Sequence, residues 1–85
     1  MTIRAVVKGV GHYLPERVVP NAELETLVDT TDEWITSRSG IKRRHYAAEG
    51  QTTSDMGMRA AQAALADAGL TADDIDAIIV ATSTA

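Results

Sequence analysis

This chain has 85 residues, of which 45% are hydrophobic and 24% are charged, a net charge of −4 and no cysteine. These values are ordinary for one small globular domain, and they argue against a dedicated nucleic-acid binder, a disulfide scaffold, a thiolate metal site or a cysteine nucleophile within the chain. The longest apolar run is too short to span a bilayer and the first residues carry no signal-peptide pattern, so we expect a cytoplasmic protein.

The start of the chain predicts a strand and then an irregular connection. Residues 3–9 are rich in β-branched side chains and end at a glycine, which is typical of a strand, and the two prolines in residues 11–20 indicate an irregular segment. The run Gly9-Val10-Gly11 resembles the opening of a dinucleotide fingerprint, but Leu14 occupies the place of its third glycine. We therefore reject a Rossmann site and interpret the two glycines as a relaxed turn.

A short helix is expected next, over residues 22–28. Asn21 precedes it and is a plausible N-cap, because its side chain can accept a bond from a free backbone amide of the first turn.

The following helix has marked boundaries at both ends. Thr30 and Glu33 fit a capping box, in which each side chain bonds the other residue's amide. Gly40 stands where a left-handed residue is needed to end the helix, and Ile41 can then fold back onto it as in a Schellman ending.

Residues 42–53 are polar and without a sustained period, so they predict a loop. Half of the eight basic residues gather at or just before it, namely Arg38, Lys42, Arg43 and Arg44. Such a segment could attract phosphates or an acidic partner, and it could equally be a solvated loop. His45 and His12 have no nucleophile or carboxylate placed to work with them, so we interpret both as structural or merely exposed.

Residues 54–68 predict a longer helix, capped by Thr53 or Ser54 and ended by Gly69. Six alanines in it allow close approach on more than one face, which favours burial in a larger layered body. Residues 71–74 could cap one further turn.

The apolar run 77–81 does not alternate, as expected of a strand covered on both faces of a parallel sheet. A strand, helices and a second strand of this kind predict an α/β layered fold. Because two strands cannot form such a sheet, we interpret the chain as an incomplete domain.

Trp34 and Arg38 are the strongest candidates for binding. They are four residues apart on the capped helix and therefore share a face. An indole platform and a planar cation together could hold a nucleotide-bearing ligand. The alternative is an amphipathic helix with a core tryptophan and a snorkelling arginine.

Taken together, these segments resemble the start of β-ketoacyl-acyl carrier protein synthase III. The resemblance covers essentially the whole chain in one unbroken order, and Ser39 is a small departure where the family commonly has threonine. The stretches that carry it are Gly9 to Pro15 (GVGHYLP), Val28 to Ile35 (VDTTDEWI), Arg38 to His45 (RSGIKRRH) and Ile78 to Ser83 (IIVATS).

The resemblance implies a thiolase-like fold of two similar α/β halves, usually paired into a homodimer, with residues 1–85 as the amino-terminal segment of the first half and the remainder absent. It implies decarboxylative condensation of acetyl-CoA, or a related acyl-CoA primer, with malonyl-acyl carrier protein to start fatty acid synthesis. The family's cysteine nucleophile, histidine and asparagine match no position present here. Thiolate attack on a thioester and stabilisation of an enolate oxygen are the steps they perform.

For site residues, the resemblance implies that Trp34 matches the family's adenine-stacking tryptophan, Arg38 the arginine of its CoA-binding face and Thr30 a threonine near CoA. It implies no catalytic residue, no metal ligand and no tightly bound cofactor in this chain, with acyl-CoA as substrate. No contact with the carrier protein is carried over to the basic run.

Two alternatives stay open. A priming synthase of a secondary-metabolite pathway could share this amino terminus, and would differ mainly beyond residue 85. The chain could also be a stand-alone module that binds CoA or an acidic partner, although an isolated 78–80 strand would leave apolar surface exposed.

Overall fold

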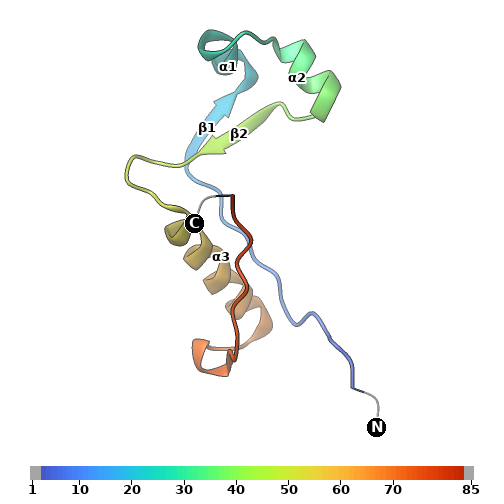
Figure 1. The fold of residues 1–85 in the computed structure, drawn as a ribbon, viewed down its shortest axis with the longest axis vertical. Helices are drawn as coiled ribbons and strands as arrows, with labels where there is room; N and C mark the ends of the chain where they lie inside the picture. Colours follow the sequence, from blue (N-terminus) through green and yellow to red (C-terminus); the bar gives the residue numbers. More distant parts are fainter. Residues whose placement is uncertain (1–2, 84–85) are drawn as a thin grey trace. The chain divides into compact units, whose positions relative to one another are not determined.

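The structure is a computed structural model that describes residues 3–83. It contains both helices and strands, as expected for part of an α/β fold, and falls into two compact units: residues 14–50, and the remainder of the described chain (Figure 1). In chain order the elements are β1 (Arg17–Pro20), α1 (Asn21–Leu27), α2 (Asp32–Ser39), β2 (Arg43–Tyr46), α3 (Thr53–Ala68) and the 3-10 turn η1 (Ala72–Asp74).

The unit of residues 14–50 is built on a two-stranded antiparallel sheet. β1 pairs with β2 so that Arg17 lies opposite Tyr46 and Pro20 opposite Arg43. The predictions of an irregular segment over 11–20 and a loop over 42–53 are therefore wrong at these positions. Each strand has only four residues, too few to show an alternating pattern, and β2 is mostly basic.

Helices α1 and α2 pack at one end of this sheet around a very small core (Figure 1). Its buried apolar residues are Val19, Leu24 and Ile35, one each from β1, α1 and α2, with the half-buried Tyr46 packed against them. Since α2 contributes a single buried side chain, apolar packing alone restrains this helix weakly.

The prediction that Asn21 caps its own helix is wrong. Helix α1 begins at Asn21, and Pro20 holds the N-cap position without a side-chain bond. The Asn21 amide side chain is only 1% exposed and bonds to residues after α1 instead, so its oxygen and nitrogen are unavailable to the first turn.

Helix α2 starts one residue later than predicted. The hydroxyl of Thr31, not Thr30, accepts the amide of Trp34 at 3.1 Å. The proposed Thr30–Glu33 box is not formed, since the amide of Thr30 donates to the Val28 carbonyl at 2.9 Å. Glu25 of α1 accepts the amide of Asp32 at 2.6 Å and so satisfies a free donor of the first turn.

The end of α2 is confirmed at Gly40, which has a left-handed φ of +73°. The Schellman ending is not formed there, since the amide of Ile41 donates to the hydroxyl of Ser39 at 3.2 Å. Helix α3 has that ending instead: Leu70 donates to the Leu65 carbonyl across the left-handed Gly69.

Helix α3 begins at Thr53, one residue earlier than predicted, and Thr52 rather than Thr53 or Ser54 caps it. Thr52 and Asp55 form a complete capping box. The further turn predicted at 71–74 is confirmed as η1, where Thr71 and Asp74 form a second box.

The two predicted strands at 3–9 and 77–81 are not formed in the described chain. Their large apolar side chains are exposed, for example Val7 at 81% and Ile79 at 97%. A ladder needs a neighbouring strand to accept and donate its backbone bonds, and no segment of residues 3–83 pairs with either run.

The Gly9-Val10-Gly11 run is not a turn. A Cβ on Gly9 would meet the backbone of Ala64 and Ala68 at 2.8 and 2.7 Å, and one on Gly11 would overlap the amide of Ala64. Neither glycine has a positive φ. They are glycines because the chain runs directly against the alanine face of α3, a close approach that the sequence pattern could not distinguish from a turn.

Candidate nucleotide-binding face of α2

Helix α2 presents Trp34 and Arg38 on one exposed face. The spacing of four residues stacks them one turn apart, and the Arg38 guanidinium carbon lies 5.4 Å from the centre of the Trp34 ring. Trp34 is 56% exposed, so the core-tryptophan alternative does not describe it in residues 3–83. The ring therefore leaves an aromatic surface open to a ligand or to another part of the protein.

Thr30 reaches the same place from the connection before α2. A small open hollow is lined by Asp29, Thr30, Thr31 and Trp34. Its volume is about 270 Å³, below the roughly 300–1,000 Å³ of a whole ligand pocket. It therefore suits part of a ligand, such as a ring lying against the indole, with the rest outside it.

The charges around this face differ from end to end. Asp29 lines the hollow, while Arg38 provides a cation one turn further along α2 than Trp34. A negatively charged group is therefore favoured on the Arg38 side, and a group that donates hydrogen bonds is favoured beside Asp29 and Thr30. Among the residues that line this face, the arrangement suits the binding and orientation of a ligand rather than acid–base or nucleophilic catalysis.

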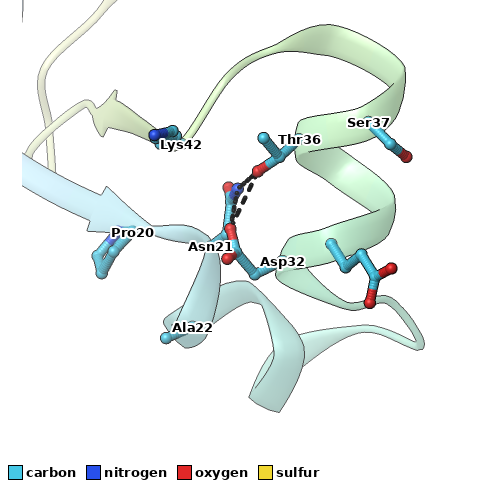
Figure 2. Close-up of a pocket in the computed structure, with 8 residues that line it drawn as sticks. Pro20, Asn21, Ala22, Asp32, Thr36, Ser37 and Lys42 are labelled. Atoms are coloured by element: carbon cyan, nitrogen blue, oxygen red, sulfur yellow. Dashed lines mark hydrogen bonds between the residues drawn. The ribbon is translucent and has the colours of Figure 1, made fainter.

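Asn21, predicted as an N-cap, instead connects several segments of this unit through its side chain. Its side-chain nitrogen donates to Asp32 Oδ1 and to the Ile41 carbonyl, both at 2.8 Å, and approaches Thr36 Oγ1 at 3.4 Å. Its oxygen lies 3.5 Å from a guanidinium nitrogen of Arg44. Figure 2 shows this amide pointing at Asp32 and Thr36. In the sequence, an asparagine just before a helix fits an N-cap as well as it fits a buried side chain that bonds several distant residues.

A larger hollow, of about 730 Å³, surrounds this network (Figure 2). Three of its polar side chains, those of Asn21, Asp32 and Thr36, are already engaged with one another. We assign it no ligand. Its lining residues are Pro20, Asn21, Ala22, Asp32, Glu33, Thr36, Ser37 and Lys42.

The histidine interpretation is confirmed for His45, which is half-buried and bonds through Nδ1 to the carbonyl oxygen of Pro15. That contact ties the segment before β1 to β2, so it is structural. His12 is exposed. Within residues 3–83 no cluster of three or more histidine, cysteine or acidic side chains is placed to hold a metal ion, and no helix there has the length and apolarity to cross a membrane.

Comparison with known proteins gives a clear relationship along the whole chain, although no family model matches. The chain is 79% identical over all 85 residues to a β-ketoacyl-[acyl-carrier-protein] synthase III of Cereibacter sphaeroides and 75% identical to that of Ruegeria pomeroyi. In each case it spans 26% of the relative's length. The whole chain is thus similar to the amino-terminal part of β-ketoacyl-[acyl-carrier-protein] synthase III.

Solved structures agree with this assignment to synthase III. The 3-oxoacyl-[acyl-carrier-protein] synthase III of Aquifex aeolicus superposes with a TM-score of 0.72 at 48% identity, covering 80% of this chain and 22% of that one. The priming β-ketosynthase of the R1128 polyketide pathway superposes with a TM-score of 0.76 at 44% identity, covering 82% and 21%. The fold class predicted from the sequence, part of a thiolase-like α/β fold, is thereby confirmed.

Proposed function

We propose that this chain works as the amino-terminal part of a β-ketoacyl-acyl carrier protein synthase III. The whole enzyme would condense acetyl-CoA, or a similar acyl-CoA primer, with malonyl-acyl carrier protein and so initiate fatty acid synthesis, as a cytoplasmic homodimer. The observation that carries the proposal is the 79% identity to such a synthase along the entire chain.

The contribution of these residues is to bind the nucleotide end of acyl-CoA. The adenine stacks on the exposed ring of Trp34, beside the hollow that Thr30 helps to line. Its amino group then lies near the oxygen acceptors of Asp29 and Thr30, while the phosphates extend toward Arg38. This orientation is supported by the charge difference along the face, because a phosphate beside Asp29 would be repelled.

The chemical step has to be supplied by the rest of the enzyme. A condensing enzyme of this type attacks a thioester with a thiolate, and this chain contains no cysteine. The 85 residues alone are therefore expected to bind but not to condense.

A priming synthase of a polyketide pathway is the second candidate, favoured by the superposition on the R1128 enzyme. The two candidates share the chemistry and differ in the primer they accept. The first candidate is favoured by the curated synthase III relatives, which reach 79% identity, and among the solved structures by 48% identity to the Aquifex aeolicus synthase III against 44% to the priming enzyme.

The test is the condensation reaction itself, measured with the full-length protein, labelled acyl-CoA primers and malonyl-acyl carrier protein. Formation of a short β-ketoacyl-carrier protein from acetyl-CoA supports the initiating synthase. Turnover only with other primers supports the priming synthase, and no product with any primer would overturn both.

A further inference from the structure

We propose that Asn21 is a positioning residue for the acyl-CoA site: its buried amide fixes helix α2, and through it the place of Trp34 and Arg38. The inference rests on the proposed function, because it assigns Asn21 a role in the binding face described above. The hydrogen bonds of the Asn21 side-chain nitrogen go to Asp32, Thr36 and Ile41, none of which belongs to that face.

Two features of the Asn21 side chain suit it to this role: it is buried, and each of its two amide hydrogens has an acceptor. Its side chain has two hydrogens and two acceptors at 2.8 Å, Asp32 Oδ1 and the Ile41 carbonyl. Asp32 is the first residue of α2, and Ile41 lies just after its end. The Asn21 side chain is therefore hydrogen-bonded at both ends of the helix. A buried amide with every donor paired is directional in a way that apolar contacts are not.

A closed triangle of bonds fixes how α2 is turned about its axis. The Thr36 hydroxyl donates to Asp32 Oδ1 at 3.1 Å and lies 3.4 Å from the Asn21 nitrogen, which also bonds Asp32 (Figure 2). Trp34 stands two residues from both Asp32 and Thr36. At 3.6 residues per turn, that spacing places it on the opposite side of the helix. Holding Asp32 and Thr36 toward Asn21 therefore turns Trp34 to the side of α2 that faces away from Asn21.

The other restraints on α2 are few. Ile35 is its only buried side chain, and a helix of eight residues is marginal by itself. The Glu25 carboxylate adds one further bond, to the Asp32 amide. The polar triangle is thus the main directional restraint on the helix, which is why its loss should move the Trp34 face rather than only lower stability.

The experiment compares two substitutions of Thr36 in the full-length protein. Thr36→Val keeps the shape of the side chain and removes the hydroxyl, while Thr36→Ser keeps the hydroxyl and serves as the matched control. Asn21→Ala removes the amide side chain that bonds Asp32, Thr36 and Ile41. Steady-state kinetics with acetyl-CoA separate KM from kcat, and far-UV circular dichroism checks the fold.

We expect Thr36→Val and Asn21→Ala to raise the KM for acetyl-CoA about tenfold, which corresponds to about 1.4 kcal/mol of lost binding through a displaced Trp34 face. The kcat should stay close to the parent's, and Thr36→Ser should restore the parental KM. A Thr36→Val protein that folds and keeps the parental KM overturns the inference. So does loss of folding in both variants, since the network would then stabilise without positioning.

A Trp34→Ala variant measured alongside separates this inference from the proposed function. If Trp34→Ala leaves KM unchanged, the binding face itself is refuted. If Trp34→Ala raises KM and the Thr36 and Asn21 variants do not, the face stands and the positioning role of Asn21 is refuted.

Discussion

At the scale of single residues, the exposed Trp34 and the buried Asn21 are each unusual for their type. Tryptophan is generally well buried, yet this ring is 56% exposed; asparagine generally faces solvent, yet this side chain is 1% exposed. The two observations are connected, because the inward bonds of Asn21 hold the opposite side of the helix that carries Trp34.

Trp34→Ala should weaken the use of acyl-CoA by about 1–3 kcal/mol, the range measured for stacking of a base on an aromatic side chain. This corresponds to a KM roughly five- to 150-fold higher, since each 1.4 kcal/mol is a factor of ten. The measurement is the initial rate of condensation as a function of acetyl-CoA concentration. Val28→Ala is the control, because Val28 is similarly exposed, at 59%, and is not part of the hollow. Equal KM values for the two variants would remove Trp34 from the site.

At the scale of elements, helix α3 and the segment before it depend on small side chains. A methyl group on Gly11 would meet the carbonyl oxygen of Ala60 at 2.6 Å and the backbone of Ala64 more closely still. Backbone cannot rotate away as a side chain can, so the segment would have to move off the helix.

Gly11→Ala should therefore lower the stability of the full-length protein by about 1–3 kcal/mol, the usual range for overpacking. Gly57→Ala is the matched control: Gly57 lies inside α3, and an added Cβ there meets nothing within 4 Å. Alanine in a helix is favoured over glycine by roughly 0.5–1 kcal/mol, so the control should be more stable than the parent. Thermal unfolding followed by circular dichroism checks both. A melting temperature for Gly11→Ala at or above the parental value would show that the close approach does not exist.

The capping box of α3 predicts a pH dependence. Hydrogen bonds from the Thr52 amide and hydroxyl hold the pKa of Asp55 below its ordinary value of 3.8. The folded state thus favours the carboxylate, and its stabilising effect is present above pH 3.8 and is lost as the pH falls through the lowered value. We expect the helical signal of the parent to exceed that of Asp55→Asn at neutral pH, and the two to converge in strong acid. A difference that stays constant with pH would contradict the cap.

Features that depend on neighbouring residues could be predicted from the sequence, and features that depend on distant residues could not. Helix ends were predicted to within a residue because Gly40, Gly69 and Thr71 act on their immediate neighbours. The four-residue strands β1 and β2 were missed because pairing across 22 intervening residues leaves no period in either strand. That Trp34 and Arg38 share a face was predicted from their spacing, and the core-tryptophan alternative was left open. The contacts of Asn21 could not be predicted, because its partners are 11 to 23 residues away.

At the scale of the whole molecule, the described chain buries very little apolar surface. Its buried hydrophobic residues are three, while long runs such as 78–80 remain between 70% and 97% exposed. A core of this size does not offset the conformational entropy lost when residues 3–83 are ordered. The exposed runs are the two segments that the sequence predicted as strands of a covered sheet.

The 85 residues expressed alone should therefore unfold over a broad temperature range and produce no β-ketoacyl product. Differential scanning calorimetry and the condensation assay check the two statements. A sharp two-state transition would show that the chain is a complete domain, and would favour the stand-alone binding module.

The intact mass of the protein isolated from its source organism tests the central claim most directly. These residues amount to 9.0 kDa and to 26% of the length of the similar synthases. If they are the front of a β-ketoacyl-acyl carrier protein synthase III, the mass should be about 35 kDa, in line with the size of a single condensing-enzyme protomer of two α/β halves. A mass near 9.0 kDa would contradict the proposed function and leave only binding through Trp34 to be tested.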